Sequence, residues 1–168
     1  MDDALVAVGG VGNGREVVTE VLRTGSSTWE RGPDLPYPSE HLAATAAGGR
    51  AYSIAGRYQS LEGNLDTVVS FAPGEKEWRR EPNLRRSRGG IGAAAPAGNP
   101  CVAGGEAPDG TIASVECLVR GRWRDMAALT VPRHGVAVVA IGGTLHIIGG
   151  GPRPGLFVSD THEAFDLF

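Results

Sequence analysis

Short apolar runs separated by turn residues make up almost the whole chain, and the runs recur in groups of four. One complete group consists of the runs 42–47, 50–55, 66–72 and 77–80. Gly48 and Gly49 leave room for only a tight turn between the first two runs. Runs of this length between turns predict β-strands, and four consecutive strands predict a small antiparallel sheet. No segment has the apolar spacing of a helix of three turns.

The groups are spaced regularly along the chain. Each of three tryptophans is followed six residues later by a leucine, and 27 residues later by a glycine that ends a pair of small residues. The positions are Trp29, Trp78 and Trp123, then Leu35, Leu84 and Leu129, then Gly56, Gly105 and Gly150. A fixed spacing of this kind indicates one structural unit that has been repeated. The distance from a glycine pair to the next tryptophan varies, so each repeat has one connection of variable length.

Small residues are concentrated in the first run of each repeat, as in 91–96 and 136–141. Where sheets are arranged radially about an axis, the innermost strands are the most crowded, so small side chains are expected there. The tryptophans belong to the fourth run, where a large ring fills the wider space between sheets. Glycine pairs such as Gly104 and Gly105 predict a strand bulge or a close approach of neighbouring backbone.

These features resemble the kelch repeat, the unit of one class of β-propeller. The resemblance rests on the glycine pairs, the tryptophans, the turn 132–135 with the sequence Pro-Arg-His-Gly, and the segment 145–151 that closes a second run. The resemblance covers nearly the whole chain, and the kelch proteins that the chain resembles are those of the bacterial type. Three positions depart from the pattern: Ala55 replaces a glycine of a pair, Ser39 stands where Arg88 and Arg133 stand, and Pro100 begins a second run.

The resemblance implies an all-β, kelch-type β-propeller of about three and a half four-stranded antiparallel blades in an incomplete ring. The expected repeats are 1–32, lacking the first strand, then 33–81 and 82–126, and finally 127–168, lacking the fourth strand. The strands then number 3, 4, 4 and 3. Because propellers typically have four to eight blades, we expect the C-terminal part of a longer propeller. Head-to-tail self-association that closes the ring is the alternative.

Bulk composition narrows the possible classes of protein. With 41% hydrophobic and 21% charged residues, the chain has the composition of a soluble globular protein. No apolar run approaches the ~20 residues of a transmembrane helix, and the first three residues do not begin a signal peptide. A formal net charge of −3 argues against a nucleic-acid partner. The compartment stays open.

Two cysteines, Cys101 and Cys117, fall in one repeat. A hairpin centred on 108–110 would place them roughly opposite each other on neighbouring strands, so a disulfide is geometrically conceivable. Two buried free thiols that fill space between sheets are the favoured interpretation.

The variable loops predict where a ligand would bind. In an antiparallel blade the entry to strand one, the exit of strand two and the entry to strand three share one end, so the loops 11–14, 57–65, 106–111 and 151–155 lie together. This face is expected to be rich in guanidinium groups, which bind carboxylates through paired, charge-assisted hydrogen bonds. The candidate ligand-binding residues are Arg57, Tyr58, Arg86, Arg88, Arg133, His134 and Arg153.

Two observations limit this prediction. Glu40, Glu106 and Asp109 belong to the same loops and neutralise part of the positive charge. Arg88 and Arg133 occupy a repeated position, so they are equally well explained as scaffold residues that bond backbone carbonyls of adjacent blades. Arg57 and Arg153 lie in loops of unequal length and are therefore the better functional candidates.

Catalytic chemistry finds little support in the sequence. The run 90–95 has the spacing of a dinucleotide fingerprint, but it falls on an inner strand and not at the start of a helix. The four histidines show no paired spacing, so neither a metal site nor a cofactor is predicted. Glu20, Glu116 and Glu163 recur at equivalent places on the third strand, which favours a scaffold role. A galactose oxidase-like copper site is disfavoured because too few tyrosines are available.

The function predicted is therefore a non-catalytic recognition scaffold that binds an acidic peptide of a protein or an acidic carbohydrate at the arginine-rich face. The alternative, by analogy with kelch-type enzymes, is a sialic-acid mutarotase or epimerase. In that case the arginines would hold the sugar carboxylate, and His134 or Glu106 would move protons.

Overall fold

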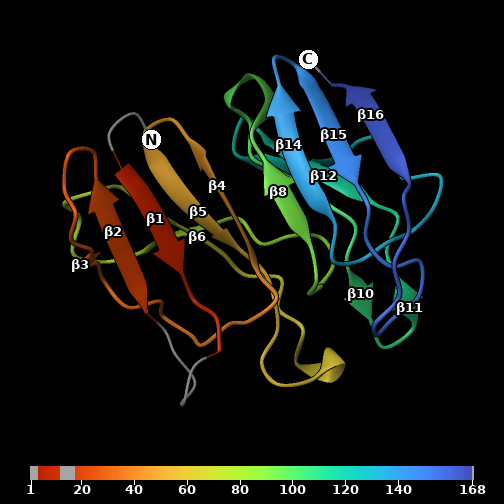
Figure 1. Cartoon of the computed structure of the whole chain (residues 1–168), viewed down its shortest axis with the longest axis horizontal. Coiled ribbons are helices and arrows are strands. Elements are labelled where there is room, and N and C mark those ends of the chain that lie inside the picture. The colour runs from red at the N-terminus through yellow and green to blue at the C-terminus, as the bar shows by residue number, and fades with distance from the viewer. Residues whose placement is uncertain (1–3, 12–17, 168) are drawn as a thin grey trace.

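The computed structural model describes residues 4–11 and 18–167, and in them the strands form four antiparallel sheets that lie side by side in chain order (Figure 1). The first sheet is β1 (Ala4–Val8), β2 (Thr19–Arg23) and β3 (Glu30–Arg31). The second is β4 (Ala43–Ala47), β5 (Arg50–Ile54), β6 (Val68–Phe71) and β7 (Arg79–Glu81). The third is β8 (Gly92–Ala94), β9 (Cys101–Ala103), β12 (Val115–Val119) and β13 (Arg122–Asp125). The fourth is β14 (Ala137–Ile141), β15 (Thr144–Ile148) and β16 (His162–Asp166).

The sequence-based fold class is confirmed. Each sheet is a meander in which consecutive strands are neighbours, and over the described residues the sheets form an open arc without closing a ring (Figure 1). A short hairpin, β10 (Glu106–Ala107) and β11 (Gly110–Thr111), adds two strands in a segment that was expected to be loop. The helical content of the described residues is two three-residue 3₁₀ turns, η1 (Leu61–Gly63) and η2 (Pro96–Gly98). Neither is long enough to cross a membrane.

The apolar core lies between neighbouring sheets. One cluster joins the second and third sheets through residues such as Ile54, Val68 and Val102, all at most 1% exposed. Another joins the third and fourth sheets around Val115 and Leu145. The leucines six residues after each tryptophan are all buried. Burial of apolar surface between sheets therefore holds the blades together.

The glycine pairs allow the backbones of successive blades to meet. Gly105 donates its N–H to the carbonyl of Arg133 in the next blade at 2.8 Å, and Gly10 makes the same bond to Ser39. A Cβ on Gly104 would lie 2.3 Å from that Arg133 oxygen, and the Gly104 φ of +67° also favours glycine. The predicted close approach of backbone is thus what the pair makes possible.

The tryptophans tie each blade to the connection that precedes it. Trp78 donates its indole N–H to the carbonyl of Pro33 at 2.9 Å, and Trp123 donates to Pro82 at 2.7 Å. Trp29, the residue immediately before β3, is 44% exposed. The indoles of the second and third blades therefore supply a hydrogen bond as well as the volume expected of them.

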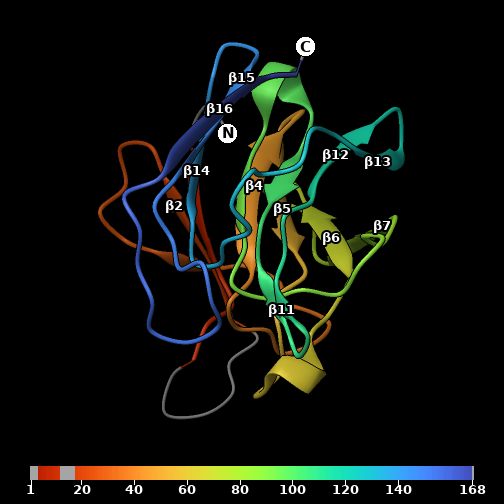
Figure 2. The ribbon, with the colours of Figure 1, turned by 90° about the vertical axis from the view of Figure 1, so that its right-hand side faces the viewer.

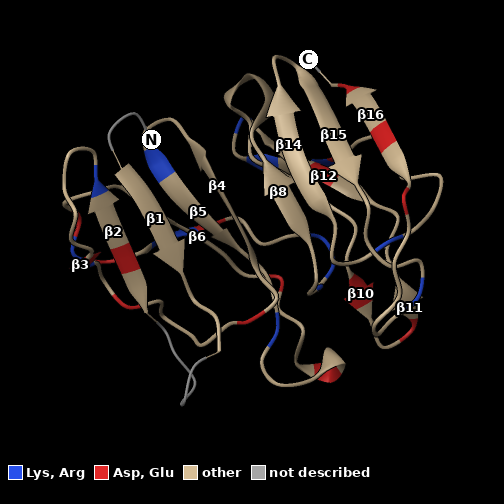
Figure 3. Ribbon diagram, in the orientation of Figure 1, with Lys and Arg blue, Asp and Glu red and all other residues tan. Residues whose placement is uncertain are grey.

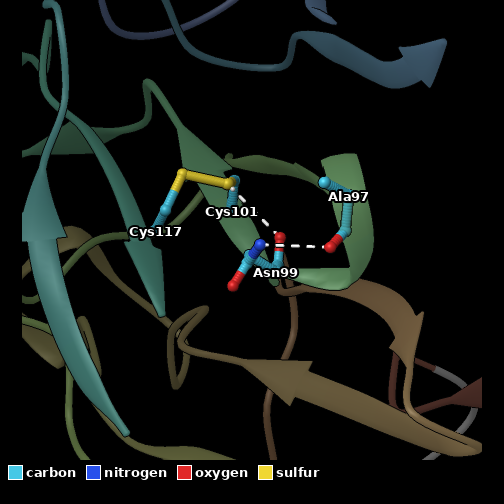
Figure 4. The surroundings of a disulfide bond; sticks show 4 residues. All are labelled: Ala97, Asn99, Cys101 and Cys117. Carbon is cyan, nitrogen blue, oxygen red and sulfur yellow. Dashed lines mark hydrogen bonds between the residues drawn. A yellow bond between two sulfur atoms is a disulfide. The ribbon is translucent and has the colours of Figure 1, made fainter. Parts of the chain in front are cut away.

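The favoured interpretation of the two cysteines was wrong. Cys101 and Cys117 form a disulfide between β9 and β12, and no cysteine is free in the described residues (Figure 4). The register pairs the two residues directly, with their Cα atoms 4.0 Å apart. Direct cross-strand pairing brings the sulfur atoms together, so the hairpin argument gave the correct geometry.

Candidate functional site

The turns that enter each first strand meet the loops that leave each second strand at one end of the molecule. Backbone bridges join Glu40 to Arg57, Gly89 to Glu106 and His134 to Gly151. Figure 2 shows β11 and η1 at this same end. We call this end the loop face, and define it as residues 39–41, 57–65, 86–89, 106–111, 133–134 and 151–158. Within the expected loop 11–14, residues 12–14 lie outside the described residues.

Three of the candidate loops are linked by one charged network centred on Glu106. Arg57 Nη1 donates to Glu106 Oε1 at 2.7 Å, and His134 Nδ1 lies 3.6 Å from Glu106 Oε2. The Glu106 side chain is only 5% exposed. Glu40 approaches the same arginine, with Oε1 3.9 Å from Arg57 Nε. The network joins the second, third and fourth blades, and Glu106 and Glu40 offset the charge of Arg57. Figure 3 shows acidic and basic residues interspersed along the ribbon at this end.

His134 also anchors the loop that follows β15. Its Nε2 is 2.9 Å from the carbonyl oxygen of Arg153, and its backbone exchanges two hydrogen bonds with Gly151. Thr111, on β11 of the neighbouring hairpin, donates to the carbonyl of Pro152 at 3.2 Å. The base of this loop is therefore held by two adjacent segments of the loop face.

The remaining candidate arginines differ in what they contact. Arg86 donates to both carboxylate oxygens of Asp109, at 2.5 and 2.7 Å, with both side chains exposed. The Arg153 guanidinium has no carboxylate partner among the described residues and lies 6.0 Å from the centre of the Phe157 ring. Arg153 is thus the candidate best placed to meet an incoming anion.

Arg88 and Arg133 are fully buried and bind the scaffold. Arg88 donates to the carbonyls of Gly104 and Ser114 and pairs with Glu116. Burial lowers the pKa of its guanidinium, and the Glu116 carboxylate counteracts that shift. Arg133 donates to the carbonyls of Val131 and Gly149 and pairs with Glu163 at 2.5 Å. The geometry favours the scaffold alternative for both arginines. It also explains why Glu116 and Glu163 recur at equivalent places, since each pairs with one of these arginines.

A small recess of about 80 Å³ lies at the loop face between the first and second blades. Arg57 and Tyr58 line it, together with Gly10, Val11, Pro38, Ser39, Glu40 and Gln59. Arg57 Nε is buried and makes no hydrogen bond in the described part of the chain. Burial, followed by the nearby Arg57 charge, lowers the pKa of the adjacent His41. The recess therefore combines a polar arginine edge with an aromatic ring.

The structure brings Arg57 and His134 together through Glu106, places Arg86 and Arg153 separately, and removes Arg88 and Arg133 from the surface. Glu106 is the residue whose importance the sequence understated. It immediately follows a glycine pair, at the repeat position that Arg57 occupies one blade earlier. Opposite charges at equivalent positions of successive repeats were the signal available.

Comparisons with known proteins agree on the repeat. No protein-family model matches the chain. Over 158 residues it is 29% identical to the Kelch repeat protein M-T8 of Myxoma virus, covering 89% of this chain and 30% of that protein. It is 28% identical to the Kelch-like protein terF of Aspergillus terreus, covering 82% of this chain and 31% of that protein. The chain is a kelch-repeat protein.

The structural comparison agrees with this assignment. The kelch chain is similar to the solved structure of YjhT, with a TM-score of 0.73 at 16% identity, covering 87% of this chain and 48% of that one. Beta-scruin of Limulus polyphemus is 27% identical, covering 73% of this chain and 15% of that protein. The kelch chain thus spans less than a third of these curated relatives. These relatives are viral, fungal and animal, so they lend no support to the expected bacterial type.

Proposed function

We propose that this kelch chain is a non-catalytic recognition scaffold whose loop face binds an acidic segment of a partner protein. Arg153 carries the proposal, because its charge is unneutralised by the described residues while its loop is anchored at the base. A guanidinium held in a preorganised loop binds a carboxylate without first giving up another ion pair. The other exposed candidate, Arg86, would have to release Asp109 first.

The neighbouring surface supports a protein ligand. Leu156 and Val158 are 105% and 88% exposed, and they flank the half-exposed Phe157. Apolar side chains next to a cation suit a peptide that carries both apolar and acidic residues. An acidic carbohydrate would use the arginine and leave the apolar residues uncovered, so it ranks second.

The binding test uses a fluorescent peptide that contains glutamate and leucine, and N-acetylneuraminic acid as the carbohydrate probe. We expect saturable peptide binding that weakens as salt is added and falls several-fold in Arg153→Ala. Arg122→Ala, which removes an exposed arginine of β13 remote from the loop face, is the matched control. Equal peptide affinity for Arg153→Ala and the parent chain would contradict the proposal. Preference for the sugar acid would reassign the ligand class.

An enzymatic alternative rests on the proximity of His134 and Glu106. Both side chains are mostly buried, and both already have partners in Arg153 and Arg57. This arrangement leaves little access for a substrate, so we propose binding over catalysis. Proton NMR of a sialic-acid mixture tests the alternative: anomer exchange accelerated by the chain and abolished by His134→Ala would establish it.

We also propose that the chain associates head to tail through the sheets at the two ends of the arc. Val139, Ile141 and Ile148 are 44%, 67% and 44% exposed on the last sheet, and Leu5 is 64% exposed on the first. Between the inner sheets the corresponding faces form the apolar core. Covering these faces would bury apolar surface in the same way.

A further inference from the structure

Two histidines meet on the exposed side of the last sheet. His146 lies on β15 and His162 on β16, and these strands are neighbours in the last sheet (Figure 1). In the register of the two strands, His162 is opposite Ile148 and His146 is opposite Ala164. The two histidines are therefore diagonal neighbours on one face of the sheet. His146 Nδ1 is 3.1 Å from His162 Nε2, and the ring planes are inclined by 23°.

The contact leaves both rings available for further chemistry. A neutral imidazole has one N–H and one free lone pair, so one ring donates and the other accepts in this hydrogen bond. No other hydrogen bond or ion pair to either ring occurs in the described part of the chain. The adjacent side chains Val139 and Ile148 are apolar and partly exposed. The pair is open to solvent and has no partner that would compete with an incoming ion.

We propose that His146 and His162 form a two-imidazole site for a divalent transition-metal ion of the zinc, nickel or copper class. Imidazole nitrogen is a preferred ligand of these ions. Two nitrogens 3.1 Å apart subtend about 98° at an ion placed about 2.05 Å from each. This angle lies between the ~90° of square-planar and the ~109° of tetrahedral coordination. The strand register brings the two rings close enough for a chelate.

Binding replaces the hydrogen bond between the rings. Each ring turns about its χ2 bond until its lone pair converges on the ion, which the exposed position of the pair allows. The donor ring moves its proton to its other nitrogen through solvent, so the ion joins two neutral rings without net loss of a proton. The described residues contain no cluster of three or more metal-binding side chains. Water therefore fills the other coordination positions, and Mg²⁺ and Ca²⁺, which require oxygen ligands, are excluded.

The site is independent of the proposed recognition function, because it lies on a sheet face whereas the arginines lie on the loop face. It shares its face with Val139 and Ile148 of the proposed head-to-tail contact, so the ion is expected to bind the unassociated chain. Sixteen residues separate the two histidines, so their contact was not predicted from the sequence. Only the pairing of β15 with β16 brings them together.

The test is calorimetric titration of the untagged chain with Zn²⁺, Ni²⁺ and Cu²⁺, with Mg²⁺ as the negative ion. We expect one ion per chain and at least a tenfold loss of affinity in both His146→Gln and His162→Gln. His41→Gln, which removes an exposed histidine of the loop face, should bind as the parent does. Absence of saturable binding, or binding unchanged in the two sheet variants, overturns the proposal.

A second measurement on the parent chain needs no variant. Long-range proton–nitrogen NMR of the histidine rings should show saturable movement of His146 Nδ1 and His162 Nε2 on addition of Zn²⁺, reversed by EDTA. Movement confined to His41 or His134 would place the ion elsewhere and overturn the assignment.

Discussion

At the scale of single residues, the buried arginine and glutamate of the third and fourth blades occur as a pair, and the second blade lacks both. Arg88 faces Glu116 in the third blade, and Arg133 faces Glu163 in the fourth. In the second blade the register puts Val69 at the place of Glu116, and Ser39 stands at the place of the arginine. Ser39 instead donates to the carbonyl of Ala55 at 2.9 Å. Losing both members together avoids a buried unpaired charge, whose cost would be several kcal/mol.

Acid is expected to destabilise the fourth blade through Glu163. Burial alone would raise the pKa of this carboxyl, but hydrogen bonds from Thr130 and Arg133 outweigh burial and hold the pKa below its usual 4.5. A pKa that is lower when folded gives stability that is complete above the unfolded value and is lost as pH falls through the folded one. Unfolding free energy should therefore drop below pH 4.5, with a shallower drop in Glu163→Gln. An equal slope in both proteins would contradict the pairing.

A glycine at the junction of two blades should be far less replaceable than one in an open turn. Gly104 and Gly142 have similar φ angles, +67° and +61°, but only Gly104 has a neighbour, the Arg133 oxygen, in the path of a new Cβ. Gly142→Ala should cost roughly 1–2 kcal/mol from its left-handed backbone alone. Gly104→Ala should cost clearly more, because the blades must also separate. Urea unfolding of the two variants measures the difference, and equal costs would exclude the close approach as its cause.

At the scale of the strand pair, the disulfide depends on register. Cys101 and Cys117 are 16 residues apart and pair directly, which closes a loop that the unfolded chain must carry. A crosslink around a loop of about this length stabilises by roughly 3 kcal/mol. Unfolding in urea with a reductant should show a loss of this size. The Cys101→Ala/Cys117→Ala double variant should have this lower free energy of unfolding both with and without the reductant. Detection of two free thiols in the chain unfolded without a reductant would contradict the disulfide.

The same spacing has a different result one blade later. His146 and His162 are also 16 residues apart, but in the fourth sheet His146 pairs with Ala164 and His162 pairs with Ile148. The two histidines are therefore diagonal, whereas the cysteines are opposite. For the cysteines the sequence suggested a contact across a hairpin, whereas no pairing of the histidines was predicted. In both blades the register of the strand pair decided the geometry.

At the scale of the whole molecule, the last sheet of one chain is expected to associate with the first sheet of another. Ile148 lies on the exposed face of the last sheet, in the place that buried Ala103 occupies in the third. Sedimentation should show association that grows with concentration and is weakened by Ile148→Asp. Val158→Asp, an equally apolar position on the loop 151–158, is the control. A parent chain that stays monomeric over the whole concentration range would remove the proposal of self-association.

The charge of the loop face was only partly predictable. The sequence located the arginines in segments that do converge, and it noted the acidic residues among them. It could not show that Arg57 bonds Glu106 from the next blade, because 49 residues separate them. It also could not distinguish the exposed Arg86 from the buried Arg88, two positions further on.

By itself, the sequence determined the repeat, the strand order and the small inner strands, because each depends on spacing and side-chain size that are visible along the chain. Strand register, the disulfide, the neutralisation of most of the predicted arginines and the histidine pair were decided only by the tertiary structure. Each of these depends on which residue lies opposite which across a strand pair or a blade boundary. A shift of one residue in a strand moves a side chain to the other face, and no local pattern fixes such a pairing.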